Sequence, residues 1–208
     1  MRIVKEAEER KNEILDVAER LFCTKGFDRT STNDILNEIG IARGTLYYHF
    51  KSKEDILDAM IERLTNQMVA KASQIALDES IPVLERLTRT LLSLNVDNEL
   101  GNMIMEEVHR PQNALMHQKL EDILLGRVNK LITIIAEDGI KQGIIHTDYP
   151  AEAIEMLMTY SYKAFDSLNT YSQEEEYRKV MAFVYHSERV LGMESGSLME
   201  AMRPVFEK

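Results

Sequence analysis

Apolar residues recur at helical intervals almost throughout this 208-residue chain, and no useful length of it alternates like a strand. The nine glycines and four prolines fall mainly at breaks between these periodic segments. An apolar position every three or four residues is typical of a helix that buries one face. A hydrophobic content of 44% is ample for a packed core. The sequence therefore predicts an all-α protein.

The N-terminal part predicts three helices and the start of a fourth. The first reads "EERKNEILDVAERLFCTKG" and ends at Gly26. The second starts after Ser31, a plausible N-cap with Asp34 three residues later, and ends at Gly40, while the third occupies about 43–49. The fourth, of about 53–76, is expected to connect a domain of residues 1–55 to a helical domain of residues 56–208.

Longer and more apolar helices are predicted after Asp78. Prolines at 82, 111 and 150 lie at or just before helix starts, where the missing amide hydrogen costs least. The expected helices occupy about 81–95, 99–109, 113–141, 151–169 and 173–191.

The stretch "DILNEIGIARGTLYYHF" has the parts that a helix-turn-helix requires. Gly40 can adopt the tight or left-handed conformation of the turn. Apolar residues on both sides lock the two helices together: Ile35, Leu36, Ile39, Ile41 and Leu46. Arg43, Thr45, Tyr48 and His49 are then left to face outward.

This outward set suits a DNA groove better than a surface that only has to be soluble, for which Glu and Lys would serve. The formal net charge of the chain is −10, yet residues 20–53 carry six basic residues against three acidic ones. A small phosphate-facing surface on an acidic body is the expected arrangement.

"KGFDRTSTNDILNEIGIARGTLYYHFKSKEDIL" resembles the DNA-binding segment of the TetR family of bacterial transcriptional repressors, and the likeness extends over about residues 10–57. The resemblance implies a three-helix DNA-binding domain, a connecting fourth helix, and a C-terminal domain for ligand binding and dimerisation. It also implies a repressor that leaves its double-stranded operator when a small-molecule effector binds. The DNA contacts that it implies are Ser31, Thr32, Arg43, Gly44, Thr45, Tyr47, Tyr48, His49, Lys51 and Lys53.

Two positions depart from the family pattern. Leu36 stands where the family usually has Ala, which predicts slightly wider helix packing. Ala42 stands where a capping Ser or Thr is common, so the third helix lacks a side-chain cap, at a cost of about 1 kcal/mol unless DNA phosphate or water satisfies the free amides. Phe50 is expected in the core, Tyr47 between packing and phosphate, and Tyr48 outside.

The C-terminal half carries no transferable motif. Its methionines adapt to irregular apolar shapes, and its tyrosines offer polar handles, so they are candidates for an effector pocket as well as for plain core packing. Glu106, His109 and His117 also permit a metal interpretation, but polar pocket lining or surface is favoured, and no metal site is predicted. The pocket candidates are Met103, Met105, Glu106, His109, Met116, His117, Met158, Tyr160 and Tyr162.

The last two long helices, at 151–169 and 173–191, have broad apolar faces. Two such helices can pair with their copies across a twofold axis, although packing within one chain is the simpler alternative. A homodimer is favoured because one helix-turn-helix reads few base pairs, and two copies reach successive major grooves about 34 Å apart.

Other functions leave little trace in the sequence. A glycine-rich phosphate loop, a nucleophile elbow and an HExxH pair are all missing, so no reaction and no cofactor are predicted. A helical adaptor that uses the outward Tyr and His residues stays an alternative. No segment is apolar enough for a signal peptide or a membrane span, so a cytoplasmic location is expected, and the single Cys23 cannot form an intramolecular disulfide.

Overall fold

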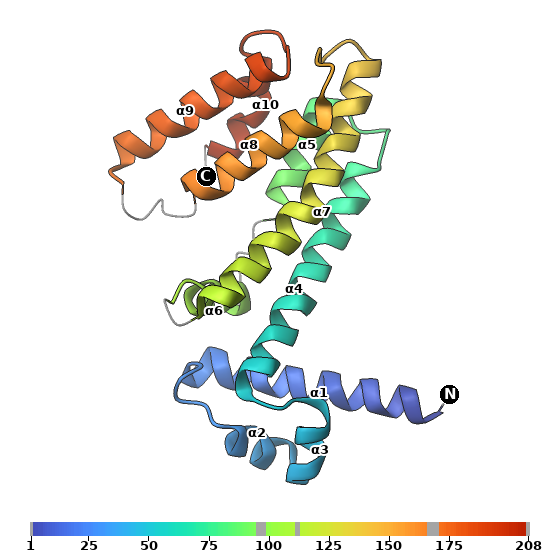
Figure 1. Ribbon diagram of the computed structural model, residues 1–208, viewed down its shortest axis with the longest axis vertical. Coiled ribbons are helices and arrows are strands. Elements are labelled where there is room, and N and C mark those ends of the chain that lie inside the picture. The colour runs from blue at the N-terminus through green and yellow to red at the C-terminus, as the bar shows by residue number, and fades with distance from the viewer. Residues whose placement is uncertain (1, 95–98, 111–112, 166–170, 207–208) are drawn as a thin grey trace. The chain divides into compact units, whose positions relative to one another are not determined.

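The computed structural model describes residues 2–94, 99–110, 113–165 and 171–206, and every regular element in these ranges is a helix (Figure 1). The all-α class is therefore confirmed. The first four helices are α1 (Arg2–Lys25), α2 (Thr32–Ile39), α3 (Arg43–His49) and α4 (Lys53–Ala76). They are followed by α5 (Val83–Leu92), α6 (Glu99–Val108), α7 (Ala114–Lys141), α8 (Pro150–Phe165), α9 (Gln173–Val190) and α10 (Ser197–Phe206).

The chain packs as two compact units. Unit 1 combines residues 1–67 with 96–120, and unit 2 combines residues 68–95 with 121–208. Helices α4 and α7 each contribute to both units. The boundary expected at 55/56 divides the chain by function rather than by packing, and it stays a prediction.

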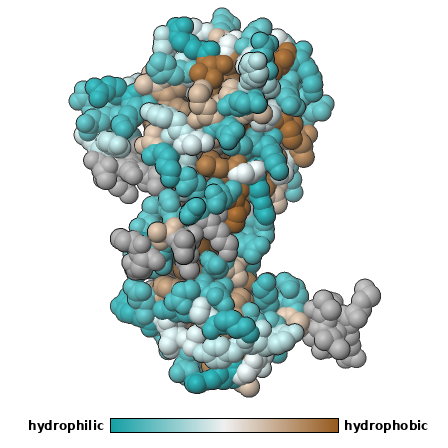
Figure 2. Space-filling model, viewed as in Figure 1, coloured by the Kyte–Doolittle hydropathy of each residue, from teal (hydrophilic) through white to brown (hydrophobic). Residues whose placement is uncertain are grey.

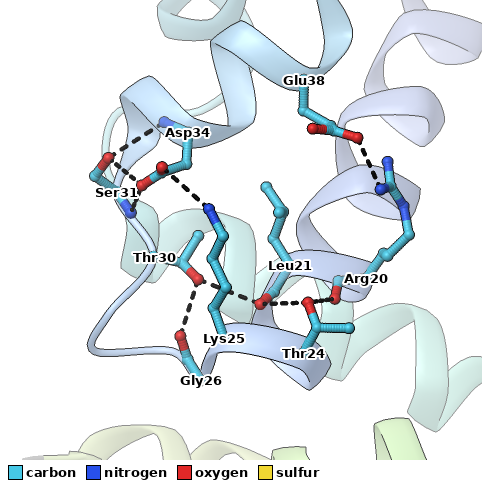
Figure 3. A network of polar contacts seen from close by, with 9 residues as sticks. All are labelled: Arg20, Leu21, Thr24, Lys25, Gly26, Thr30, Ser31, Asp34 and Glu38. Atoms are coloured by element: carbon cyan, nitrogen blue, oxygen red, sulfur yellow. Dashed lines mark hydrogen bonds and ion pairs between the residues drawn. The ribbon is translucent and has the colours of Figure 1, made fainter.

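The start and end of α2 follow the sequence signals, and Figure 3 shows the contacts at the start. The Asp34 amide donates to the Ser31 hydroxyl oxygen at 3.2 Å, and the Ser31 amide donates to the Asp34 carboxylate at 2.8 Å, which forms a capping box. Gly40 closes the helix with a left-handed φ of 75°, and its amide donates to the Leu36 carbonyl at 2.9 Å. These contacts confirm the predicted cap and the predicted turn.

Polar contacts join α2 to the end of α1 in unit 1 (Figure 3). Arg20 pairs with Glu38 at 2.8 Å, and Lys25 pairs with Asp34 at 3.3 Å. The buried Thr30 hydroxyl donates to the Gly26 carbonyl at 2.9 Å. Helices α1 to α4 also supply the apolar core of unit 1. Its fully buried side chains include Ile14, Phe22, Ile35, Leu46, Ile56, Leu57 and Met60. This core fixes α2 and α3 against α1 and α4.

Unit 2 contains α10, a helix that the sequence analysis did not predict. The buried Glu188 carboxylate of α9 accepts hydrogen bonds from the amides of Gly196 at 2.8 Å, Leu198 at 3.0 Å and Met199 at 3.1 Å. It therefore caps the N-terminus of α10 from another element. The core of the unit is aliphatic and is centred on α7, with Val128, Ile132, Ile135 and Ala136 buried beside Val83 and Val184.

Helix ends in unit 2 differ from the predictions by a few residues. The helix expected at 81–95 ends at Leu92, and α8 starts at Pro150 rather than at 151. Residue 95 and residues 166–169, which were assigned to predicted helices, lie outside the described residues. Terminal positions are the least certain part of any helix assignment from sequence.

Candidate nucleic-acid interface

Helix α3 presents one buried residue and a polar outer face. Leu46 is 1% exposed, whereas Tyr48 is 74% exposed and Tyr47 is 38% exposed. Arg43 and Gly44 are also exposed, and Thr45 and His49 are half-buried. Figure 2 shows mainly polar and intermediate side chains on the visible face of α2 and α3. The structure therefore gathers the predicted α3 contacts on one short helix, with Tyr48 outermost, as expected.

A second helix supports this face through a residue that the sequence analysis missed. The Arg43 guanidinium Nη2 donates to Asn33 Oδ1 of α2 at 2.9 Å, and both residues are exposed. Asn33 follows Ser31 and Thr32, two predicted DNA contacts, so it lies in the first turn of α2. Its place next to those residues was the available signal.

The start of α3 agrees with the predicted departure from the family pattern. Ala42 is the N-cap residue, with φ −67° and ψ 146°, and it makes no side-chain hydrogen bond to the helix. The Thr45 amide donates to the Ala42 carbonyl at 2.9 Å instead. Leu36, the other departure, is buried at 8% exposure.

The two lysines after α3 are used differently. Lys51 is exposed, and its Nζ donates to the Tyr47 carbonyl at the end of α3 at 3.0 Å. Lys53 Nζ donates to the Phe27 carbonyl at 2.8 Å and lies 4.1 Å from the centre of the Phe27 ring. Lys53 therefore fastens the start of α4 to the α1–α2 loop, and its contact with phosphate stays a prediction.

Unit 2 contains an apolar pocket of about 320 Å³ that includes two of the predicted effector residues, Met158 and Tyr162. Its other lining residues are Met68, Leu94, Leu124, Leu125, Val128, Ser161 and Phe165. None of these side chains is charged. The pocket is consequently suited to a small hydrophobic molecule with one or two polar groups.

Two other predicted effector residues, Met103 and Glu106, line a larger opening in unit 1 of about 850 Å³. We call it the α1–α6 pocket. Its walls come from the end of α1, the α1–α2 loop, α6 and the turn after α6: Phe22, Cys23, Thr24, Gly26, Phe27, Asp28, Arg29, Glu99, Asn102, Met103, Glu106, Glu107 and Arg110.

The remaining effector candidates do not line either of these pockets. Met105 is exposed, and Tyr160 is exposed on α8, where its ring stacks on Phe183 at 5.9 Å between centroids. The rings of His109 and His117 lie 5.1 Å apart. The side chain of Met116 lies outside the described residues.

Among the described residues no group of three His, Cys, Asp or Glu side chains is arranged to hold a metal ion. A search of the same residues finds no helix with both the length and the apolar character that crossing a membrane requires.

Comparison with known families identifies both halves of the chain. Residues 14–60 match the family described as bacterial regulatory proteins of the tetR family, and residues 97–185 match a tetracyclin repressor-like C-terminal domain. The chain belongs to the TetR family. The first match contains α2 and α3, so α3 is the second helix of the helix-turn-helix in this family's N-terminal domain.

Curated relatives within the TetR family are regulators. The HTH-type transcriptional regulator TtgR of Pseudomonas putida is 35% identical over 122 residues, which cover 58% of this chain and 55% of TtgR. The chain thus spans little more than half the length of that relative. The HTH-type transcriptional regulator YhgD of Bacillus subtilis is 29% identical over 173 residues, which cover 76% of this chain and 84% of YhgD.

Two solved structures show the same fold, and the first is named for the TetR family. A regulator from Syntrophomonas wolfei superimposes with a TM-score of 0.59 at 26% identity, covering 90% of this chain and 97% of the other. RolR in complex with resorcinol gives a TM-score of 0.62 at 16% identity, covering 96% of each chain. The fold class and the family resemblance are therefore confirmed.

Proposed function

We propose that this TetR-family chain is a ligand-responsive transcriptional regulator, a repressor that a small molecule releases from its operator. The observation that carries the proposal is the outer face of α3, where Arg43 is held by Asn33 beside the exposed Tyr48. An arginine at the start of a groove-sized helix can donate two hydrogen bonds to a guanine edge. Tyr48 and Thr45 have the groups for thymine methyl or phosphate contacts.

Contacts to the DNA phosphate backbone would lie around the outer face of α3. Ser31 and Thr32 lie at the start of α2, and Lys51 follows the end of α3 as an exposed cation. Such groups fix the register of a protein on the duplex without reading sequence. Gly44, Tyr47, His49 and Lys53 complete the proposed DNA-contacting set. DNA binding would place the protein in the bacterial cytoplasm, where its operator lies.

The proposed assembly is a homodimer through α8 and α9. On α8 the exposed residues recur at helical spacing, with Glu152, Glu155, Met156 and Tyr160 on one side. On α9, Tyr177 and Tyr185 are exposed two turns apart. Large apolar side chains on two neighbouring outer faces favour burial against a second copy. A twofold dimer would present two α3 helices to successive half-sites.

The effector is proposed to bind in unit 2, in the apolar pocket that Met158 and Tyr162 help to line. A ligand that binds only one conformation of the protein shifts the population towards it by its difference in affinity. The resorcinol bound in the RolR structure is a property of that protein. In this chain, the uncharged lining of the unit 2 pocket favours a small hydrophobic effector.

Genomic fragments retained by the purified chain, mapped and then titrated at several salt concentrations, test this function. Affinity for the selected fragments should fall steeply with salt, because phosphate contacts release counterions. Arg43→Ala should lose the preference for those fragments while retaining weak binding to any duplex. A chain that selects no fragment, or whose partner binding is insensitive to salt, would favour the adaptor alternative.

A further inference from the structure

The α1–α6 pocket lies within unit 1 and is lined by more negative than positive groups. Its carboxylates are Asp28, Glu99, Glu106 and Glu107, and its cations are the guanidinium groups of Arg29 and Arg110. The lining therefore has two negative charges in excess. Solvated carboxylates on an acidic protein are ordinary, so the case for a binding site depends on the carboxylate of the lining that is buried.

Glu107 is the buried carboxylate of this lining, and its set of partners is incomplete. Its residue is 3% exposed, and its Oε1 pairs with Arg110 Nη2 at 3.0 Å. Its Oε2 is buried and has no hydrogen-bond partner among the described residues. Burial raises the pKa of this carboxyl, because an apolar environment disfavours the charged form. A donor that enters the pocket would satisfy an oxygen that is costly to leave unpaired.

Arg110 does not supply enough positive charge for its surroundings. Its guanidinium contacts Asp28 and Glu107, and it lies 3.8 Å from Glu106. Arg110 is thus shared among three carboxylates, although Lys53 adds a positive charge that acts on Glu107. A further cation at the pocket would be attracted by the excess of two negative charges in the lining, most strongly where burial limits screening by water.

The geometry favours an extended organic cation over a metal ion. The carboxylates belong to the two ends of α6 and to the α1–α2 loop, and no three of the described acidic, histidine or cysteine side chains are arranged to hold one ion. Apolar groups of Phe22, Phe27 and Met103 also line the pocket. A chain of ammonium groups separated by methylene segments carries both kinds of group that such a lining can contact.

We propose that the α1–α6 pocket binds a linear aliphatic polyamine, with one ammonium group donating to Glu107 and others near Glu99 and Glu106. A pocket of about 850 Å³ is large enough for such a molecule. This site is separate from the uncharged pocket of unit 2, and it takes a different class of ligand. The proposal does not depend on DNA binding.

Calorimetric titration of the full chain with spermidine, at low ionic strength, tests the proposal. We expect one saturable site per chain. Glu99→Gln combined with Glu106→Gln should weaken it by about tenfold or more, since it removes two charge-assisted contacts. Both replaced residues are exposed, so the variant should keep its helical circular dichroism and melting temperature. Glu107→Gln should weaken binding as well, and it removes the innermost contact.

General attraction of a polycation to a chain of net charge −10 is the competing explanation. The matched control is Glu79→Gln combined with Glu174→Gln, which removes the same charge from exposed positions of unit 2. Its effect should stay below about twofold. Equal losses in the control and pocket variants, displacement of spermidine by Mg²⁺ at matched ionic strength, or an absence of saturable binding would each overturn the proposal.

Discussion

The guanidinium of Arg43 in α3 donates a 2.9 Å hydrogen bond to the side-chain oxygen of Asn33 in α2. This bond joins the two helices of the helix-turn-helix at their exposed sides. Arginine has many rotamers in water, and a fixed one loses less conformational entropy when it docks on a base pair. Asn33 therefore serves as a positioning residue for the proposed base reader.

We predict that Asn33→Ala weakens binding to the preferred operator by about 0.5–1.5 kcal/mol and leaves non-specific binding almost unchanged. Arg43→Ala should cost about 1–3 kcal/mol and relax preference at one base position per half-site. The double variant should cost less than the sum of the two, because Asn33 acts through Arg43. Titrations of all four proteins against an operator and its single-base substitutions would measure this. Strictly additive losses would separate the two roles.

The two lysines that follow α3 should respond to different measurements. Lys51→Ala removes an exposed charge, so it should weaken binding to all DNA sequences alike and reduce the salt slope by about one contact per subunit. Lys53→Met removes the hydrogen bond to the Phe27 carbonyl and the contact with its ring. It should lower the free energy of unfolding by roughly 1–2 kcal/mol. Urea unfolding and salt titration of both variants provide the comparison. An unchanged salt slope for Lys53→Met would remove Lys53 from the proposed DNA-contacting set.

The dimer proposal predicts monomers when a charge is placed on the exposed faces of α8 and α9. Met156→Glu and Tyr185→Glu would each bury an unpaired carboxylate at the interface, at a cost of several kcal/mol. Light scattering across a range of protein concentrations would detect dissociation. Leu77→Glu is the control, because Leu77 is an exposed apolar residue of unit 2 outside both helices. If neither interface variant dissociates, the contact lies elsewhere.

Local signals were the part of this fold that sequence could predict. Ser31 and Asp34 are three residues apart, and Gly40 supplies a left-handed turn, so the boundaries of α2 follow from short-range chemistry. Tyr48 outside and Phe50 in the core follow from helical periodicity. The family resemblance extended this local reading to the DNA contacts.

Long-range contacts were the part that sequence could not predict. The Asn33–Arg43 hydrogen bond joins residues ten positions apart across a turn, and the Lys53–Phe27 hydrogen bond joins residues 26 positions apart. The capping of α10 by Glu188 likewise requires the fold, since Glu188 lies on another helix, ten positions before Leu198. Spacing along a helix identifies a face, but it does not identify what the face meets. For the same reason, the predicted effector residues fall in two different pockets or line neither of them.

The carboxylate of Asp34 should give the helix-turn-helix a measurable acid sensitivity. Hydrogen bonds from the Ser31 side chain and backbone, together with Lys25, lower the pKa of Asp34 to about 2. A carboxyl whose pKa is lower in the folded chain than in the unfolded chain stabilises the fold at any pH above its unfolded pKa, which is near 4. That contribution is lost as the pH falls through the folded pKa. The stabilisation should therefore be complete at neutral pH and should be lost between about pH 4 and pH 2.

Comparing the wild type with Asp34→Asn isolates this effect from the many other carboxyl groups that titrate in acid. The variant should be less stable at pH 6, and its difference from the wild type should shrink as the pH is lowered from 4 to 2. Protonated Asp34 loses the charge that strengthens its hydrogen bonds from Ser31 and its pairing with Lys25. Urea unfolding at each pH measures the difference. Asp148→Asn, at an exposed aspartate of unit 2, is the matched control and should show no such trend. A difference for Asp34→Asn that is the same at pH 6 and at pH 2 would mean that the charge of this carboxylate does not stabilise the start of α2.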